Sequence, residues 1–529
     1  MKEKTNSIES FFYGFIIIGF FALLLNFFFK LDIFLNTIIF IFLIFFSFKN
    51  ILNNKKLYIL KESFIIFILS FIILAYSKTY EDSAGYHIPY TNILNDSKII
   101  FGISNIHFRF GHVSIFQYID AFGYNYFLQS SGIVTSSAFL VSAVYFYFFK
   151  ELQKIKKING ESCFIILVFI FIILRFNRYG DFGNDAQAHL YAILSFYFLI
   201  RSIDQNKINF FFKALIFSMF AFLQKVFFLP LIFLITLLGF YNYKYKFIIS
   251  KSSLFVVFFS IIYFIKNFIV SGCFLYPVSF TCLDLVNWYS NNLDSYTNAT
   301  AISLQSEAWA KSWNTYFQEG AQISYKTYLS NFTWLTNWLI NHGHIIVSKL
   351  LFFFMLSTIF VLMIGKNKLY FILKENIKYY YNNKYFLILF FFSFLLFLFW
   401  FLKFPIFRYG TSYIFFVLYF IILLFCNHQF KIKKKFILYC SFILLSIPIT
   451  KNIFKIYNNF STRSFFPEIN LLKLTDDIQT IKVNNFNIYT TNYYGCFYGK
   501  SPCTTEKQNL DKIKIEMKYS YLFINLKNP

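Results

Sequence analysis

The chain has 529 residues, of which 58% are hydrophobic and 14% are charged. Soluble domains carry about 25% charged residues around one apolar core, so this composition excludes an ordinary soluble protein. We predict an all-α polytopic integral membrane protein, with the lipid bilayer as a partner. The formal net charge of +25 does not indicate a nucleic-acid binder, because the lysines stand in short blocks between apolar runs, as in the cytoplasmic loops of membrane proteins.

Apolar runs long enough for membrane-spanning helices recur along the first 450 residues. From their length and composition we predict about thirteen spans. They are expected at residues 10–29, 31–48, 63–77, 129–149, 163–175, 189–201, 208–224, 226–240, 253–271, 345–365, 386–402, 410–426 and 437–450.

The lysine blocks predict how these spans are oriented. If the N-terminus is cytoplasmic, nearly all of the blocks fall on the cytoplasmic side, as the positive-inside rule requires. The exoplasmic side then receives the connections 78–128, 176–188, 272–344 and 403–409 and the tail. We therefore predict a multi-span transmembrane domain over residues 1–450 and an exoplasmic tail domain over residues 451–529.

The segment TYEDSAGYHIPY, residues 79–90, places Glu81, Asp82 and His87 directly after the third predicted span. Transfer of a group from a phosphate leaving group to a hydroxyl needs one base for the acceptor and cations for the departing charge. We predict that Asp82 or Glu81 is this base and that His87 belongs to the same catalytic site. The alternative is that the two acids cap a following helix, because acids favour the first helical turn.

Basic residues of the predicted exoplasmic connections are candidates to hold a lipid-linked phosphate. They are Arg109, Lys225, Lys403 and Arg408. Arginine binds phosphate through paired hydrogen bonds, and cations at the headgroup plane suit an amphiphilic substrate. The alternative for each is contact with lipid headgroups.

Two further acids, Asp181 and Asp185, lie in the connection 176–188 and are candidates for substrate binding. Their carboxylates can coordinate a hard cation such as Mg²⁺ or Mn²⁺. The alternative is a turn built by the neighbouring glycines and Asn184. A divalent cation therefore stays an open option, and the sequence assigns no metal ligands.

Four cysteines fall on the side expected to be oxidising. Cys273 and Cys282 are close in sequence, and so are Cys496 and Cys503. We predict two local disulfides, Cys273–Cys282 and Cys496–Cys503.

Acids in the first large outer connection, many spans, a long later outer connection and an outer tail resemble the GT-C class of membrane glycosyltransferases, which use polyprenyl-phosphate sugars. Glu81 and Asp82 stand just after a spanning helix, as in that class. The phrases YHIPY, KNFIVSGCFLYP and FPIFRYG are also similar to an uncharacterised bacterial family of multi-pass proteins with GT-C-like organisation. The resemblance implies that Asp82 or Glu81 activates the acceptor and that Arg408 holds the lipid phosphate.

These observations predict a membrane glycosyltransferase that transfers a sugar from a polyprenyl-phosphate donor to a cell-surface glycan, lipid or protein. The expected location is a bacterial inner membrane, with the tail in the periplasm or outside the cell. One alternative is a surface-polysaccharide polymerase or ligase, in which Arg109 and Arg408 carry the pyrophosphate chemistry. Another is a transporter or flippase, which would place ionisable residues near the bilayer midplane.

Overall fold

The computed structural model describes most of the chain up to residue 425 and most of the last fifty residues. The described residues are 7–53, 57–74, 82–157, 159–179, 183–292, 298–313, 324–330, 332–351, 383–425, 478–491, 495–496 and 498–527, with the single positions 353, 355, 439, 446, 450, 453, 454 and 457.

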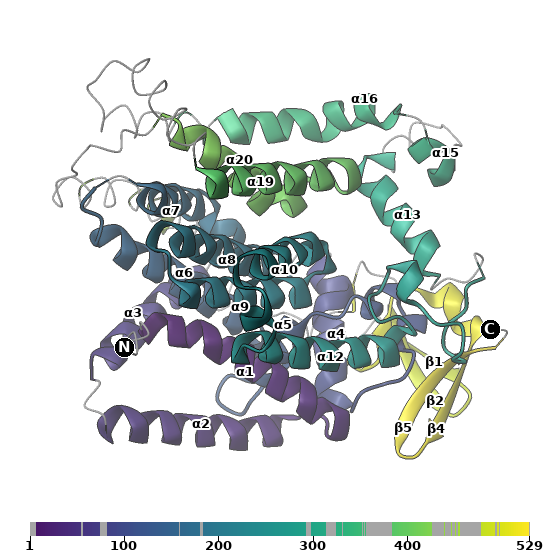
Figure 1. The fold of residues 1–529 in the computed structure, drawn as a ribbon. Helices are drawn as coiled ribbons and strands as arrows, with labels where there is room; N and C mark the ends of the chain where they lie inside the picture. The colour runs from purple at the N-terminus through teal and green to yellow at the C-terminus, as the bar shows by residue number, and fades with distance from the viewer. Residues whose placement is uncertain are drawn as a thin grey trace.

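Helices make up most of this structure (Figure 1). The long ones are α1 (Ser7–Phe28), α2 (Ile33–Asn53), α3 (Leu57–Leu74), α6 (Gly132–Gln153), α7 (Gly160–Tyr179), α8 (Asp185–Gln205), α9 (Ile208–Gln224), α10 (Leu229–Tyr243), α12 (Lys251–Ser271), α19 (Lys384–Lys403) and α20 (Phe407–Leu423). Shorter ones are η1 (Ser83–His87), α4 (Ile88–Asp96), η2 (Ile103–Asn105), η3 (Phe108–Gly111), α5 (Ile115–Gly123), η4 (Gln129–Ser131), η5 (Val226–Phe228), α11 (Tyr245–Ile248), η6 (Ser279–Thr281), α13 (Ala299–Ala310), α15 (Tyr325–Ser330), α16 (Trp334–Trp338), η7 (Leu339–Gly343) and η10 (Lys507–Lys512).

Seven of the described helices are long and apolar enough to cross a membrane: α1, α2, α3, α6, α10, α12 and α19. In a bilayer such runs must form helices, because only a helix satisfies the backbone hydrogen bonds within the segment. These are the features of an α-helical integral membrane protein. Three more predicted spans coincide with shorter apolar helices, Gly160–Ile172, Ile208–Gln224 and Phe407–Leu423.

The remaining three predicted spans have different outcomes. The span expected at 189–201 lies in α8, which is a helix but is not among the seven candidates. The spans expected at 345–365 and 437–450 lie largely outside the described residues.

Helix α8 occupies the centre of the bundle, and every residue from Ala186 to Ile200 is buried. It carries buried polar side chains such as Gln187 and Ser195 among its apolar ones, which lowers its overall hydropathy. It packs against α6, α7, α9 and α20. Protein neighbours therefore cover this helix where lipid would cover a peripheral span.

Consecutive long helices run in opposite directions between two polar ends. Helix α8 runs from Asp185 to Arg201, a distance of about 24 Å at 1.5 Å per residue. Helix α9 returns, because Lys213 near its start pairs with Glu9 while Lys225 at its end pairs with Asp185. We call the end that holds Asp185 the cluster end, after the group of charged residues described in the next section. We call the other end the opposite end.

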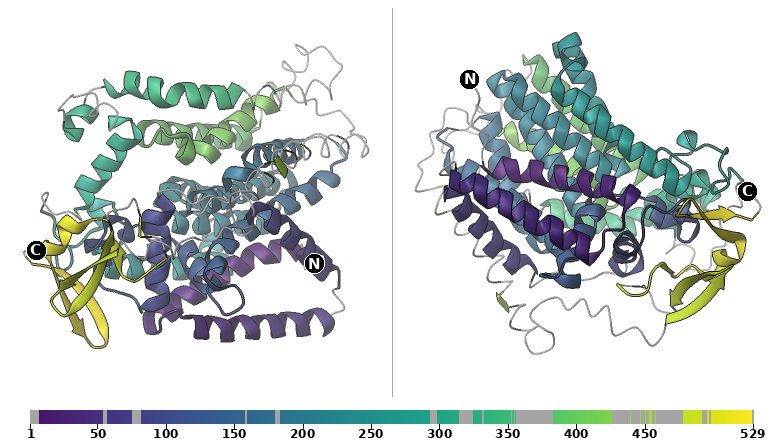
Figure 2. Two further views of the ribbon diagram at one scale, coloured as in Figure 1. Left: turned by 180° about the vertical axis from the view of Figure 1, so that it is seen from behind. Right: turned by 90° about the horizontal axis from the view of Figure 1, so that it is seen from below.

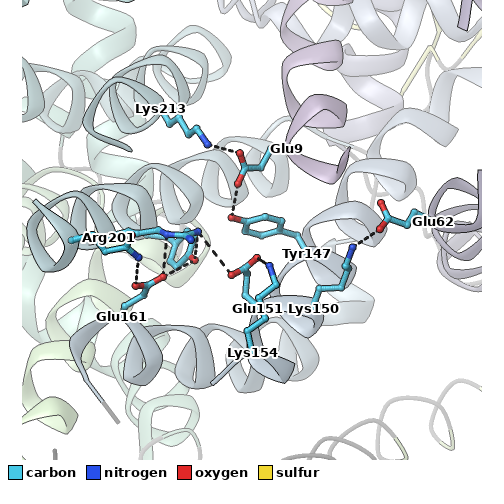
Figure 3. A network of polar contacts seen from close by, with 11 residues as sticks. Glu9, Glu62, Tyr147, Lys150, Glu151, Lys154, Glu161, Arg201 and Lys213 are labelled. Carbon is cyan, nitrogen blue, oxygen red and sulfur yellow. Dashed lines mark hydrogen bonds and ion pairs between the residues drawn. The ribbon is translucent and has the colours of Figure 1, made fainter. Parts of the chain in front are cut away.

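The opposite end is a network of ion pairs between helix termini (Figure 3). Lys213 Nζ lies 2.5 Å from Glu9 Oε2, and the hydroxyl of Tyr147 donates to Glu9 Oε1 at 3.2 Å. Arg201 Nε lies 3.2 Å from Glu161 Oε1. These contacts tie α1, α6, α7, α8 and α9 together at one level.

The C-terminal tail departs from the all-α expectation, because residues 478–526 contain five strands. They are β1 (Ile478–Val483), β2 (Phe486–Thr491), β3 (Cys503–Thr504), β4 (Ile513–Lys518) and β5 (Tyr521–Leu526). Antiparallel β1–β2, with β3 parallel to β2, makes one sheet, and antiparallel β4–β5 makes the other. These segments are rich in β-branched and aromatic residues and short enough to be strands.

The tail packs against the cluster end of the bundle, as both views of Figure 2 show. The backbone N–H of Ile524 donates to the carbonyl of Phe101 at 2.9 Å, so β5 continues onto the connection between α4 and α5. Asn92 Nδ2 donates to the carbonyl of Gly499 at 2.5 Å, and Thr504 Oγ1 donates to the carbonyl of Ile106 at 3.0 Å. The tail thus supports the segments on both sides of residue 100.

Candidate functional site

A chain of alternating charges crosses the cluster end of the bundle. Arg408 Nη1 lies 2.7 Å from Asp82 Oδ2, and Arg408 Nε lies 3.0 Å from Asp185 Oδ2. The other oxygen of Asp185 pairs with Lys225. We call these four residues, together with Arg109, the Asp82 cluster. Their sequence positions span more than three hundred residues, and the structure brings these five of the nine predicted site residues into one region.

Each member stands at the end of a helix. Asp82 precedes η1, Asp185 opens α8, Lys225 follows the last residue of α9, and Arg408 is the second residue of α20. The helix dipole favours an acid at the N-terminus, as with Asp185, and a cation at the C-terminus, as with Lys225. It disfavours Arg408, which is a cation at the N-terminus of α20. Arg408 is therefore not placed there by capping, and the two carboxylates compensate its position.

The cluster is open enough to be reached by a ligand. The side chain of Arg408 is 29% exposed and that of Asp82 is 34% exposed. The Asp185 and Lys225 side chains are 28% and 21% exposed. At the opposite end Glu9 is only 5% exposed, whereas Lys150 is 28% exposed. Exposure therefore permits access to the Asp82 cluster but does not by itself distinguish it from a structural network.

Arg109 is the cation of the cluster without a carboxylate within ion-pair distance among the described residues. It lies in η3, where its backbone N–H donates to Nδ1 of His107 at 3.1 Å. Its guanidinium lies over the ring of Tyr86, 4.7 Å from the centroid, and Nη1 is 3.4 Å from the Tyr86 hydroxyl. The hydrogen-bond donors of Arg109 are thus only weakly used, which suits binding of an anion.

Aromatic side chains that the sequence did not single out surround the cations. Tyr409 stands beneath Lys225, whose Nζ is 3.6 Å from the ring centroid, and its hydroxyl accepts a hydrogen bond from Arg408 Nη2 at 3.3 Å. Trp309, near the end of α13, has its ring centroid 5.9 Å from the Arg408 guanidinium carbon. The signal for Tyr409 was its place in FPIFRYG. Trp309 stands four residues before Trp313, a spacing that indicates one face of an interfacial helix and does not mark a site residue.

His87 is the last residue of η1, the short helix that follows Asp82, and is neutral near pH 7. Burial lowers the pKa of His87 to about 4, although the nearby charges of Asp82 and Asp185 oppose this shift. The amide nitrogen of Asn184 is 3.3 Å from Nδ1 of His87. Because an amide nitrogen can only donate, Nδ1 acts as the acceptor, in agreement with a neutral ring.

The pKa of Asp82 lies below its ordinary value. Burial alone would raise this pKa, but the charges of Arg408 and Arg109 and the hydrogen bond from Arg408 outweigh that effect. Asp82 is therefore ionised near pH 7. While Arg408 holds it, it is a weak proton acceptor, and its basicity increases if an anion takes over the guanidinium.

Two contacts fix the backbone that carries Arg408. Nε2 of His189 lies 2.8 Å from the carbonyl oxygen of Arg408, so this nitrogen carries the proton and donates, while Nδ1, 2.9 Å from the Ser412 hydroxyl, accepts. The indole N–H of Trp400 donates to the carbonyl of Ile406 at 2.9 Å. A Cβ on Gly410 would lie 2.2 Å from this indole, so glycine is required where α20 meets Trp400.

The other predicted site residues have separate outcomes. Lys403 does not pair with Asp82 or Asp185 but with Glu307, whose Oε2 is 3.0 Å from Lys403 Nζ, and Lys311 holds the other oxygen of Glu307. Glu307 lies two residues before Trp309 on α13, so this second ion pair is next to the cluster. Glu81 and Asp181 lie outside the described residues.

The structure joins Cys273 to Cys282 and Cys496 to Cys503 as disulfides. The first closes the segment after α12, and the second closes the tail loop that contacts Asn92. Within the described part of the chain, no three His, Cys, Asp or Glu side chains are arranged to hold a metal ion. Both carboxylate oxygens of Asp185 form ion pairs, one with Lys225 and the other with Arg408. These contacts do not support the hypothesis that Asp185 binds a metal ion.

All five cluster residues lie within the part of the chain that matches a known family. Residues 1–415 match the model of a family described as a domain of unknown function, DUF8201. The chain belongs to this family. No curated protein and no solved structure matches the chain. The strands of the tail, which begin at Ile478, lie beyond the matched residues.

Proposed function

We propose that the protein is a membrane glycosyltransferase that takes a sugar from a polyprenyl-phosphate donor and transfers it to a hydroxyl of a cell-surface glycan, lipid or protein. The observation that carries this proposal is the position of Arg109 and Arg408 beside Asp82, with Arg109 free of any carboxylate ion pair among the described residues. Three cations face two described carboxylates in this cluster. The excess positive charge suits one phosphate group.

In the proposed reaction the donor phosphate binds to Arg109 and Arg408. This contact replaces the one between Arg408 and Asp82, which frees the carboxylate and raises its basicity. The acceptor hydroxyl then attacks the sugar carbon, Asp82 accepts the hydroxyl proton, and the carbon–oxygen bond to phosphate breaks with its electrons going to the phosphate. A single displacement without a covalent intermediate inverts the configuration at that carbon.

The place of the cluster fits a donor that arrives through the lipid. Its residues stand at helix ends, where an apolar chain can stay in the bilayer while the phosphate reaches the cations. We propose that the cluster end is exoplasmic, because the lysine blocks belong to connections at the other end. A single cysteine at Asn485, in the β1–β2 turn, should then react with an impermeant maleimide in intact cells; labelling only after lysis would reverse the orientation.

A polymerase or ligase is the second candidate, and one observation favours it. Asp82 is already engaged by Arg408, and its lowered pKa makes it a poor base in this state. In that case the two arginines stabilise a departing pyrophosphate, while Asp82 only positions Arg408. Asp82→Asn would then keep much of the activity, whereas the glycosyltransferase proposal requires its loss.

The proposal is tested by donor binding in lipid nanodiscs. Polyprenyl phosphate without a sugar is the probe, and native mass spectrometry counts the bound molecules. Arg109→Ala should weaken this binding at least about tenfold, as expected for loss of a charge-assisted phosphate contact. Lys482→Ala, which removes an exposed cation on β1, is the matched control and should bind as the unmodified protein does. Equal binding by all three proteins would refute the proposed phosphate site.

A further inference from the structure

The hairpin formed by β4 and β5 presents large side chains to its surroundings at its tip. Tyr519 is 92% exposed and Met517 is 61% exposed. Tyr519 and Ser520 form the two-residue turn and both have positive φ values, 50° and 64°. Asn and Gly are the usual residues of such a turn, and a bulky residue there is unfavourable. The local conformation therefore does not explain a tyrosine at position 519, whereas a contact made by its side chain would.

The hairpin is held at the level where a membrane-spanning helix ends. The hydroxyl of Tyr521 donates to the carbonyl of Phe27 at 2.9 Å, in the last turn of α1. The ring of Phe523 stacks on Phe101 with centroids 4.3 Å apart. Figure 1 shows β4 and β5 beside the adjoining ends of α1 and α2. The tip is thus placed next to the boundary between the apolar core of the bilayer and the headgroups.

The same region carries exposed apolar and basic side chains. Phe28 and Phe29, at the end of α1, are 64% and 58% exposed. Lys98 donates to the Ser520 hydroxyl at 2.9 Å and lies over the ring of Tyr521. On β4, Lys514 and Lys518 flank and pair with Glu516. Cations outnumber carboxylates at this tip, and tyrosine, with an apolar ring and a polar hydroxyl, favours the headgroup level.

We infer that the tip of the β4–β5 hairpin, with Met517 and Tyr519 at its front and the lysines behind, inserts into the headgroup layer of an anionic bilayer. We choose a lipid surface as the partner because the hairpin adjoins the end of the membrane-spanning helix α1 and because its tip is positively charged. The tail is then attached to the membrane at two places, through the helix bundle and through its own hairpin. The inference is independent of the proposed transferase activity.

The test measures the depth of a spin label at position 519 in lipid nanodiscs. Tyr519→Cys carries the label, and Asp511→Cys is the matched control: it is also exposed but lies in η10, before β4, whose six residues span about 20 Å. The free cysteines are replaced by serine and both disulfides are kept. Oxygen, which partitions into lipid, and a nickel chelate, which stays in water, compete as relaxation agents.

We expect a loss of nickel accessibility and a gain of oxygen accessibility at 519 relative to 511, because the headgroup layer excludes the chelate while oxygen partitions into lipid. This difference should appear with phosphatidylglycerol present and shrink in phosphatidylcholine alone. Equal nickel accessibility at 519 and 511 in the anionic nanodiscs would overturn the inference. Equal protection in both lipids would overturn its electrostatic part.

Discussion

Arg408 Nη1 and Asp82 Oδ2 lie 2.7 Å apart although 326 residues separate them in the chain. This pair joins the connection between α3 and α6 to α20, the last long described helix. It also couples two roles, because the guanidinium that can hold a phosphate is the group that lowers the pKa of the carboxylate. Binding of an anion would therefore change the state of the nearby base.

Asp82→Asn should abolish transfer while the protein still folds. The amide keeps the shape of the carboxylate and still accepts a hydrogen bond from Arg408, but it cannot take a proton. Loss of a general base lowers the rate by about 10²- to 10⁴-fold. The measurement is turnover of a radiolabelled lipid-linked sugar in nanodiscs. Asp96→Asn, at the exposed end of the following helix α4, is the control and should retain activity; an active Asp82→Asn variant would exclude Asp82 as the base.

Arg408→Ala and Arg109→Ala should separate stability from donor binding. Removing Arg408 leaves Asp82 and Asp185 without their shared guanidinium, so we expect a loss of about 1–2 kcal/mol after allowance for solvent screening, in addition to a higher KM for the donor. Among the described residues the Arg109 side chain makes only ring contacts and one long hydrogen bond. Its loss should therefore cost less than about 1 kcal/mol while still raising this KM. Thermal unfolding in detergent and donor titration measure the two effects. Unfolding of Arg109→Ala at a much lower temperature would show that Arg109 has a structural partner.

Protonation of histidines in the unfolded chain should lower stability as the pH drops from about 6.5 toward 4, whereas Asp96 and Asp204, whose pKa values burial raises to about 6, oppose this loss. Burial lowers the pKa of His87 to about 4 and the pKa of His107 to about 3. In this window the unfolded chain takes up protons that the folded chain does not, so folding becomes less favourable by up to about 1.4 kcal/mol per pH unit and histidine. The lowered pKa of Asp82 acts below this window, because its contribution is present above the ordinary carboxylate pKa and is lost as the pH falls through the folded value.

The pH effect is measured as the unfolding temperature between pH 7 and pH 4.5. His87→Gln should reduce the slope, because glutamine does not titrate. His342→Gln, at a position more exposed than His87, is the comparison and should change the slope less. A slope unaffected by His87→Gln would mean that the unfolded chain does not protonate this histidine in the window.

Glu9→Gln should destabilise the opposite end of the bundle. The change leaves Lys213 with a neutral partner in a place where its side chain is only 15% exposed, and the cost of such a broken pair is about 1–3 kcal/mol. Glu9→Gln combined with Lys213→Met removes both charges and should restore part of the lost unfolding temperature. A double variant less stable than the single one would contradict this account of the pair.

Much of the bundle could be predicted from the sequence, because apolar runs in lipid have few options other than helices. The emergence of Asp82, Lys225 and Arg408 at the ends of such runs was also visible. The ion-pair partners of these residues could not be predicted. Lys403 and Arg408 stand only five residues apart, yet they pair with different carboxylates. That choice depends on the packing of α13, α8 and α20, which a local pattern does not encode.

The tail shows another limit of local patterns. Its strands are six residues long or shorter. Aromatic and β-branched residues are abundant throughout this chain, so short strand segments do not differ in composition from the rest of the sequence. The two strand pairs are also stabilised from outside, by Phe101 and by the disulfide loop, and these contacts join residues some four hundred positions apart. Helix α8 is a comparable case, because its buried polar residues make sense only when all of its neighbours are known.

The final strand has a consequence for how this protein is made. Asn105 Nδ2 donates to the carbonyl of Ile524 at 2.8 Å, and the backbone N–H of Leu526 donates to the carbonyl of Asn287. The segment that carries Arg109 is therefore synthesised some four hundred residues before the strand that contacts it. A chain synthesised only as far as α20 would therefore lack the strand contacts that hold the segment next to Arg109.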